Sequence, residues 1–325
     1  MVESKMAKYL ITDAKKGVKL PAFRTDKIGG TKGREDIVWL DDTIVPGARI
    51  YSECVWFLPG MEKSKGDEPY MQEHTHDFEE VLAFFGSDTE KPRDLGGELE
   101  IWLDGVKHTV TKTSLIFIPK GMKHGPITFH RIDKPVFHFS IGGTNKYTGN
   151  ATATKDNKKS ARKTDKLIVD FLQPPKVEAP WSPNPPPAEA KDGKGGRILF
   201  LDNDIIPDGF YTECVWIMPF KGPMPKMTDE MLEKARAAVK PHKHDFDEVL
   251  CFFGTNPNDF HDLDSKIELW LGGEKQIITR STMTYIPAGV EHCPLVFHRV
   301  GSPVIHFTCF PEGKIYFTGL NKAAK

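Results

Sequence analysis

The same ordered set of segments occurs twice in this chain of 325 residues, and this repeat constrains the fold more than any other feature. Four pairs of segments match in order: HTHDFEEVLAFFG (74–86) with HKHDFDEVLCFFG (242–254), ELEIWLDG with KIELWLGG, IFIPKGMKHGP with TYIPAGVEHCP, and FHRIDKPVFHFS with FHRVGSPVIHFT. A period far longer than 50 residues indicates duplicated domains and not a solenoid. We therefore expect an N-terminal arm and first barrel over 1–145, a Pro/Gly-rich linker over 146–196, and a second barrel over 197–325.

The residue pattern within each repeat predicts an all-β fold with little helix. Segments are short, rich in Val, Ile, Phe, Tyr and Trp, and separated by Gly, Pro and Asp-Gly turns, as in antiparallel β-barrels. One helical insertion is expected near 227–239, where Thr228 can cap the first turn. It would either cover the mouth of the second barrel or form a surface insertion. The linker segment DKLIVDFL would add a short helix or strand to one of the barrels.

Histidines and glutamates recur in each repeat at spacings that suit a metal ion. His74 and His76 are two residues apart on an expected strand, so both side chains point to one face, and a carboxylate follows four residues later. A further histidine comes just after a Pro-x-Gly turn. Three imidazoles and one carboxylate suit Mn, Fe, Co, Ni or Zn and leave coordination positions open. The expected ligands are His74, His76, Glu80 and His124 in the first repeat, and His242, His244, Glu248 and His292 in the second.

These motifs resemble the two signatures of the cupin superfamily. Residues 74–80 and 242–248 are similar to its first motif, H-x-H-x3-E, and residues 119–124 and 287–292 to its second, P-x-G-x2-H. The resemblance covers roughly 37–142 and 198–312. It implies two tandem cupin (double-stranded β-helix, jelly-roll) barrels with one divalent transition metal per domain. The asparagine that often follows the second motif is missing, and Gly125-Pro126 and Cys293-Pro294 stand there instead.

Four further side chains are candidates for catalysis. Glu53 and Glu213 occur in the same Tyr-x-Glu-Cys-Val-Trp context, where an unpaired buried carboxylate would be costly. Each would serve as a general acid or base, or would accept a hydrogen bond from a ligand histidine, or would pair with an arginine such as Arg131 or Arg299. His138 and His306 alternate with apolar residues on late strands and would either transfer protons or be hydrogen-bonded core residues.

The composition indicates which binding partners and which cellular compartment to expect. Forty-four basic and 45 acidic residues nearly cancel, which gives no electrostatic reason to expect nucleic acid or membrane as a partner, so a small-molecule substrate is expected. The sequence has no apolar stretch of membrane-spanning length and no secretory signal, which predicts a cytoplasmic location. The five cysteines form no CxxC pair, which predicts buried free thiols. Cupin barrels commonly associate, so the resemblance also admits a homo-oligomer.

A metal with vacant positions in an apolar barrel supports several reactions, and the fold alone does not choose among them. The first hypothesis is a non-redox enzyme acting on a small enolisable carbonyl compound, for example by hydrolytic C–C cleavage of a cyclic diketone as in a dihydrophloroglucinol cyclohydrolase. The second is an iron- or manganese-dependent dioxygenase or decarboxylase, which oxygen consumption would distinguish from the first. The third is a binding or storage cupin without catalysis.

Overall fold

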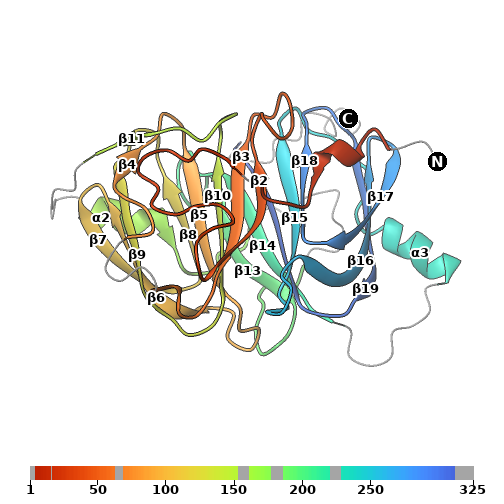
Figure 1. Cartoon of the computed structure of the whole chain (residues 1–325). Coiled ribbons are helices and arrows are strands. Elements are labelled where there is room, and N and C mark those ends of the chain that lie inside the picture. Colours follow the sequence, from red (N-terminus) through yellow and green to blue (C-terminus); the bar gives the residue numbers. More distant parts are fainter. Residues whose placement is uncertain are drawn as a thin grey trace.

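Two β-barrels stand side by side in the computed structural model, which describes residues 4–15, 17–62, 69–152, 161–176, 186–219 and 228–311 (Figure 1). Part of the expected linker and the C-terminal residues 312–325 lie outside these ranges. In the first barrel a six-stranded antiparallel sheet faces a five-stranded one. The six-stranded sheet runs in the order β12 (Ile168–Val169), β8 (Ser114–Ile118), β5 (Glu80–Gly86), β10 (Val136–Gly142), β3 (Tyr51–Phe57), β2 (Arg34–Leu40). The five-stranded sheet of the same barrel consists of β11 (Asn150–Ala151), β4 (His74–Thr75), β9 (His124–Ile132), β6 (Asp94–Leu103) and β7 (Val106–Lys112).

The second barrel repeats this design, and the prediction of an all-β chain with two tandem barrels is confirmed. Its larger sheet runs β1 (Leu10–Ile11), β18 (Thr282–Ile286), β15 (Glu248–Gly254), β20 (Val304–Phe310), β14 (Tyr211–Ile217), β13 (Gly196–Leu201). Its smaller sheet consists of β17 (Glu274–Arg280), β16 (Asp262–Leu271) and β19 (His292–Val300).

Two short strands from outside the repeated segments extend the edges of the larger sheets. Strand β1 of the N-terminal arm pairs with β18 of the second barrel, although the sequence assigns the arm to the first domain. Strand β12, from the linker segment DKLIVDFL, pairs with β8 of the first barrel. Each addition pairs the free edge of a six-stranded sheet, which would otherwise be open to pairing with another chain.

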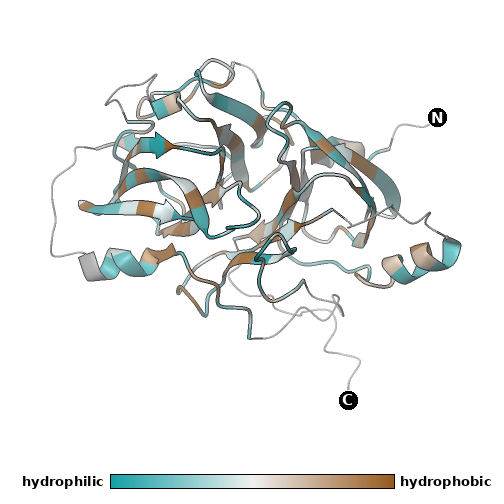
Figure 2. Cartoon of the chain, turned by 90° about the horizontal axis from the view of Figure 1, so that it is seen from below, coloured by the Kyte–Doolittle hydropathy of each residue, from teal (hydrophilic) through white to brown (hydrophobic). Residues whose placement is uncertain are grey.

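Burial patterns explain the composition of the strands. Along β6 every second residue is buried, because one face of the smaller sheet meets solvent, and Figure 2 shows this alternation of hydrophobic and hydrophilic bands. All seven residues of β5 and of β10 are buried, because their outer face packs against the other barrel. Aromatic rings fill this interface: the centroids of Phe139 and Phe307 lie 4.1 Å apart, and those of Trp56 and Phe260 4.6 Å apart.

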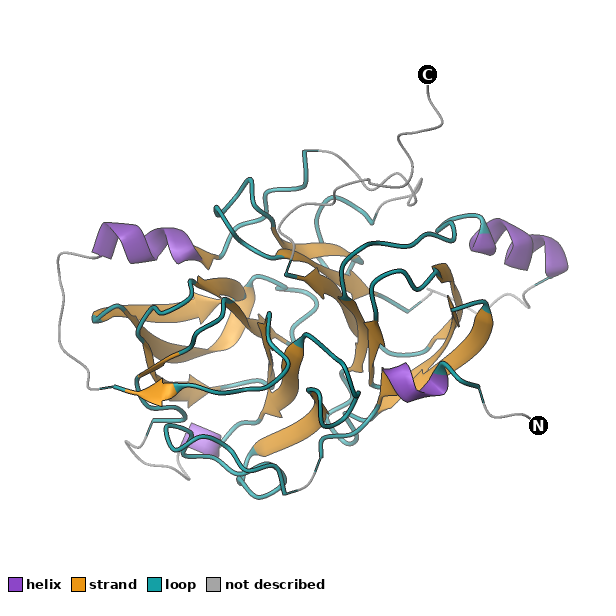
Figure 3. Cartoon of the chain, turned by 90° about the horizontal axis from the view of Figure 1, so that it is seen from above, coloured by secondary structure: helices purple, strands orange, loops and turns teal. Residues whose placement is uncertain are grey.

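Helices are short and lie at the periphery (Figure 3). Those whose bounds fall within the described residues are η1 (Ala7–Tyr9), α2 (Ala161–Thr164), η3 (Asp165–Leu167) and α3 (Asp229–Arg236). Helix α3 lies within the expected insertion; Thr228 caps it by accepting a hydrogen bond from the Met231 backbone, and Arg236 pairs with Glu268 of β16 at 3.0 Å. Among the described residues, no helix has the length and apolar character needed to cross a bilayer. All five cysteines are buried and free, as predicted.

Candidate metal centres and the cavity of the second barrel

The first barrel brings its four expected ligands together. His74 on β4 pairs in register with His124 at the start of β9, and Glu80 is the first residue of β5. The Nε2 atoms of His74 and His76 are 3.0 Å apart, and Glu80 Oε2 lies 3.6 Å from His76 Nε2 and 3.4 Å from His124 Nε2. All four residues are at most 3% exposed. Neighbouring strands thus direct three imidazoles and one carboxylate to one point.

Backbone carbonyls fix the orientation of the three rings. Each ring places its Nδ1 against a carbonyl oxygen, which only accepts, so Nδ1 carries the proton and Nε2 keeps its lone pair for the centre. The acceptors are the carbonyl groups of Gln72, Thr148 and Met122, at 2.8, 2.6 and 3.1 Å from His74, His76 and His124 respectively. Ser140 Oγ donates to Glu80 Oε1 at 2.6 Å and leaves Oε2 directed to the histidines.

Charge and hydrogen bonding in the first centre fit a divalent cation. Burial lowers the pKa of His74 and His76, so both are neutral at physiological pH. Burial opposes ionisation of Glu80, but the neighbouring His76, His124 and Ser140 outweigh it and hold the pKa of this carboxyl below its usual value. Glu80 Oε2 and His124 Nε2 are buried and have no hydrogen-bond partner among the described residues. Such orphaned acceptors require a partner, and a metal ion supplies it.

The second barrel assembles the equivalent set. His242 and His292 form an isolated bridge between their backbones, and Glu248 begins β15. Glu248 Oε2 lies 3.5 Å from His244 Nε2 and 3.3 Å from His292 Nε2. The Nδ1 atoms of His242 and His292 again face carbonyl oxygens, at 2.7 and 3.3 Å. Glu248 Oε2 and His292 Nε2 also lack a hydrogen-bond partner among the described residues.

The ionisation of the ligands differs between the second centre and the first. Burial lowers the pKa of His242 and His244 to about 4 and that of His292 to about 3. Burial also raises the pKa of Glu248 to about 8, so its carboxyl is protonated at neutral pH unless a positive charge stands beside it. Each barrel therefore carries a donor set for one divalent metal ion, and in the second barrel the ion would also keep the carboxylate ionised.

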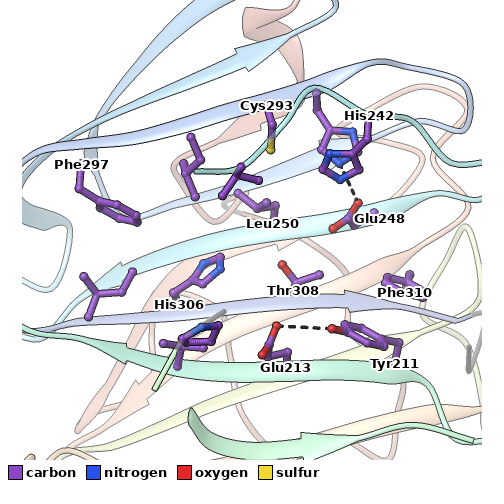
Figure 4. A pocket seen from close by; sticks show the side chains of 16 residues that line it. Tyr211, Glu213, His242, Glu248, Leu250, Cys293, Phe297, His306, Thr308 and Phe310 are labelled. Atoms are coloured by element: carbon purple, nitrogen blue, oxygen red, sulfur yellow. Dashed lines mark hydrogen bonds and ion pairs between the residues drawn. The ribbon is translucent and has the colours of Figure 1, made fainter. Parts of the chain in front are cut away.

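A cavity of about 260 Å³ adjoins the second centre. Figure 4 shows His242 and Glu248 on one side and Glu213, Tyr211, His306 and Thr308 on the other. The rest of the wall is apolar and comes from both sheets and the segment after α3: Val215, Ile217, Val239, Leu250, Leu295, Phe297 and Phe310 are among its residues. Val239 places the segment that follows α3 in the cavity wall, so the insertion is more than a surface feature.

Side chains fill the corresponding space in the first barrel. Phe23 of the N-terminal arm stacks on His74 with ring centroids 3.9 Å apart, and Tyr147 stacks on Tyr51 at 4.4 Å. Arg24 enters beside them and is buried. Tyr51, which is fully buried, corresponds to the cavity-lining Tyr211 of the second barrel. The two centres thus share ligands but differ in access.

The two candidate glutamates are both paired, in different ways. Glu53 accepts hydrogen bonds from Arg24 at 2.9 Å and from Arg34, and all three side chains are at most 3% exposed. Glu213 accepts from Arg197 Nε at 2.6 Å and from the Tyr211 hydroxyl at 3.4 Å, and its side chain is 20% exposed to the cavity.

The expected arginine partners of these glutamates are wrong. Arg131 and Arg299 lie at exposed strand ends and pair with Asp133 and Asp264. Arg24, Arg34 and Arg197 take the role instead, because the N-terminal arm and the adjacent strands β2 and β13 place them on the interior face. Sequence spacing around Glu53 and Glu213 does not indicate which arginine enters each barrel.

The two candidate histidines have the same backbone contact and different surroundings. His138 Nδ1 lies 2.7 Å from the Ala83 carbonyl, and its ring stacks on Phe84 in a fully packed interior. His306 Nδ1 lies 2.7 Å from the Cys251 carbonyl, and its ring lines the cavity. Burial lowers the pKa of both to about 4. His306 is thus the one of the pair that borders the cavity.

Cys293, which the sequence predicts only as a buried thiol, lies in the wall of the cavity. It follows His292, lines the cavity, and forms a possible metal-binding group with His242 and His292. The signal in the sequence is the difference between the repeats directly after the second motif, where Gly125 in the first corresponds to Cys293 in the second.

Comparison with known proteins gives distant structural similarity only. No family model and no curated protein matches the sequence. The chain is similar to AerE from Microcystis aeruginosa (TM-score 0.47, 10% identity, 93% of this chain and 98% of that chain). It is also similar to Bacillus subtilis oxalate decarboxylase, a protein with Mn(II) centres (TM-score 0.48, 11% identity, 91% of this chain and 81% of that chain).

Proposed function

We propose that this chain is a metal-dependent enzyme whose reaction takes place in the cavity of the second barrel. One observation carries the proposal: a metal donor set with unpartnered buried atoms opens on a cavity that also contains groups able to hold or move a proton. Perturbed ionisable residues that converge on an apolar pocket are the usual mark of an active site.

The cavity supports a small substrate with an apolar body and oxygen substituents. Its volume of about 260 Å³ lies just below the range of about 300–1,000 Å³ that is usual for sites of drug-sized ligands, so it suits a smaller molecule. The aliphatic and aromatic walls suit a carbon ring or short chain. Polar groups stand at the centre and on the opposite side, where Thr308, Tyr211 and Glu213 can bind a second oxygen of the substrate. A small enolisable carbonyl compound has this distribution.

His306 is the proposed proton carrier. Its Nδ1–H donates to the Cys251 carbonyl, so its Nε2 has a free lone pair. Because burial lowers its pKa to about 4, the ring is neutral at physiological pH and can accept a proton from substrate or water. Glu213 pairs with Arg197 and is better suited to accept a hydrogen bond from a substrate hydroxyl than to take up a proton.

A bound divalent metal would act as a Lewis acid toward a carbonyl oxygen and lower the pKa of bound water. His242, His244, Glu248 and His292 would hold it. The specific reaction that we propose is hydrolytic C–C cleavage of a cyclic diketone. Water adds to one carbonyl carbon, the bond to the neighbouring carbon breaks, and that carbon takes a proton, so the product is an open-chain carboxylic acid and nothing is oxidised. His306 accepts a proton from water and returns it to the carbon.

We propose a structural role for the first centre. Phe23, Arg24 and Tyr147 occupy the space next to its ligands, which leaves little room for a substrate. A metal there would link β4, β5 and β9 and contribute to folding, as structural metal sites do.

The test is turnover of cyclic 1,3-diketones by the purified full-length protein, with oxygen uptake recorded in parallel. His306→Gln should reduce kcat by about 100-fold or more, the contribution of a positioned base. His138→Gln, the matched change in the first barrel, should leave kcat unchanged in the folded protein. Equal losses in both variants, or turnover unaffected by His306→Gln, would refute the assignment. Oxygen consumption coupled to turnover would favour the dioxygenase hypothesis instead.

A further inference from the structure

Cys293 directs a sulfur atom to the second centre. The residue is 5% exposed, lines the cavity, and its Sγ lies within 4.8 Å of the ligand atoms of His242 and His292. Figure 4 shows this sulfur beside the His242 ring. A thiol among imidazoles is a donor that the first centre lacks, because Gly125 stands at the corresponding position.

The backbone at Cys293 has a conformation that disfavours cysteine. Its φ is 72°, in the left-handed region, and the other described non-glycine residues with positive φ are all aspartates. Gly125 has φ 80° at the matching place in the first barrel. A residue with a Cβ adopts this conformation only at a cost in free energy. A Cβ at Gly125 would lie 2.7 Å from the Gln72 carbonyl oxygen, so the first barrel has no space for a side chain that the second accommodates.

A second observation points to a ligand at the same place. His292 Nε2 is buried, has no hydrogen-bond partner among the described residues, and belongs to two overlapping donor groups. One group joins it to His244 and Glu248, and the other to His242 and Cys293. His292 is therefore shared by a donor group that contains sulfur and a donor group that contains a carboxylate.

We infer that the thiolate of Cys293 adds to the donor set of the second centre and binds the ion together with His242 and His292, which makes this centre a mixed metal site that contains sulfur. The thiol releases its proton to solvent as the sulfur–metal bond forms. Zinc and cobalt bind nitrogen and oxygen donors more tightly than manganese does, and the thiolate widens this difference at the second centre beyond that at the first centre, which has nitrogen and oxygen donors only. The inference rests on the proposed metal site of the second barrel and does not depend on the reaction.

The experiment uses the full-length protein, stripped with a chelator and reloaded with Co(II). A thiolate ligand to Co(II) gives a charge-transfer absorption in the near ultraviolet, which nitrogen and oxygen ligands do not give. Cys293→Gly installs the residue that the first barrel has and relieves the left-handed backbone, so it should fold. Cys251→Ala, which removes a buried thiol on β15 outside the metal group, is the control.

The wild type and Cys251→Ala should show the charge-transfer band, and Cys293→Gly should lose it while still binding cobalt. In Cys293→Gly the ratio of the zinc affinity to the manganese affinity of the second centre should also fall by about tenfold or more. Cobalt bound in both barrels without this band, or a band that persists in Cys293→Gly, would overturn the inference and leave the proposed metal site intact. If the second barrel binds no ion at all, the inference and the proposed function both fail.

Discussion

Glu53 is the centre of a buried ion-pair network, and Glu53→Gln tests what that network contributes. The carboxylate accepts hydrogen bonds from Arg24 and Arg34, and all three side chains are almost inaccessible to solvent. Asp26, also buried, pairs with both arginines. Glutamine keeps the shape of the side chain and removes its charge, so two guanidinium groups lose a counter-charge without a cavity being formed.

The expected loss of folding free energy follows from the pKa of Glu53. Burial alone would raise the pKa of Glu53, but Arg24 and Arg34 lower it from 4.5 to about 2. At about 1.4 kcal/mol per pH unit, this difference corresponds to about 3 kcal/mol of folding free energy at neutral pH. Loss of one partner from a buried ion pair costs about 3–5 kcal/mol, which agrees. We therefore expect Glu53→Gln to lower the free energy of unfolding by about 3 kcal/mol.

Urea unfolding at pH 7 measures this change, with Glu213→Gln as the matched control in the second barrel. The Glu213 side chain is 20% exposed, so the loss of stability in Glu213→Gln should be smaller. Because the folded-state pKa of Glu53 is depressed, its contribution is present above pH 4.5 and is lost as the pH falls towards about 2. Wild-type stability should fall through this interval more steeply than that of Glu53→Gln. A loss below about 1 kcal/mol, or equal losses in both variants, would refute the reasoning.

Three further outcomes are expected. Since burial lowers the pKa of His306 to about 4, kcat/KM should fall only as the pH approaches about 4. A fall centred near 6.5, which is the ordinary pKa of histidine, would exclude His306 as the base. Arg49→Ala removes an exposed guanidinium that pairs with the buried Asp247 between the barrels, and since the Tyr285 hydroxyl and the Ala288 N–H also donate to this carboxylate, urea unfolding should show a loss of about 1–3 kcal/mol; no measurable loss would mean that the pair contributes nothing to stability. Chelation should lower the melting temperature, and added divalent metal should restore it; a melting temperature indifferent to chelation would argue against bound metal.

The sequence was sufficient to predict both barrels and the convergence of the metal donors. His74 and His76 share a strand face by their spacing, and the Pro-x-Gly turn before His124 returns that residue to the same point. These relations depend on local geometry and on the repeat, so they can be read without coordinates. The aromatic interface also follows from strands such as β5, whose uninterrupted apolar run indicates burial on both faces.

Features that depend on long-range packing could not be predicted in this way. Arg24 lies outside the repeated segments, so nothing in the sequence links it to Glu53 or to the filling of the first barrel. The pairing of β1 with the second barrel and of β12 with the first depends on two-residue strands that carry no pattern of their own. The position of Cys293 depends on a backbone conformation that a motif does not encode.

The metal content of untagged protein, determined for the wild type and for His292→Ala, tests the central claim most directly. The two donor sets predict two transition-metal ions per chain in the wild type and one after His292→Ala, with turnover lost together with the second ion. A wild-type chain that holds no transition metal in either barrel, or a His292→Ala variant that keeps both ions, would contradict the account.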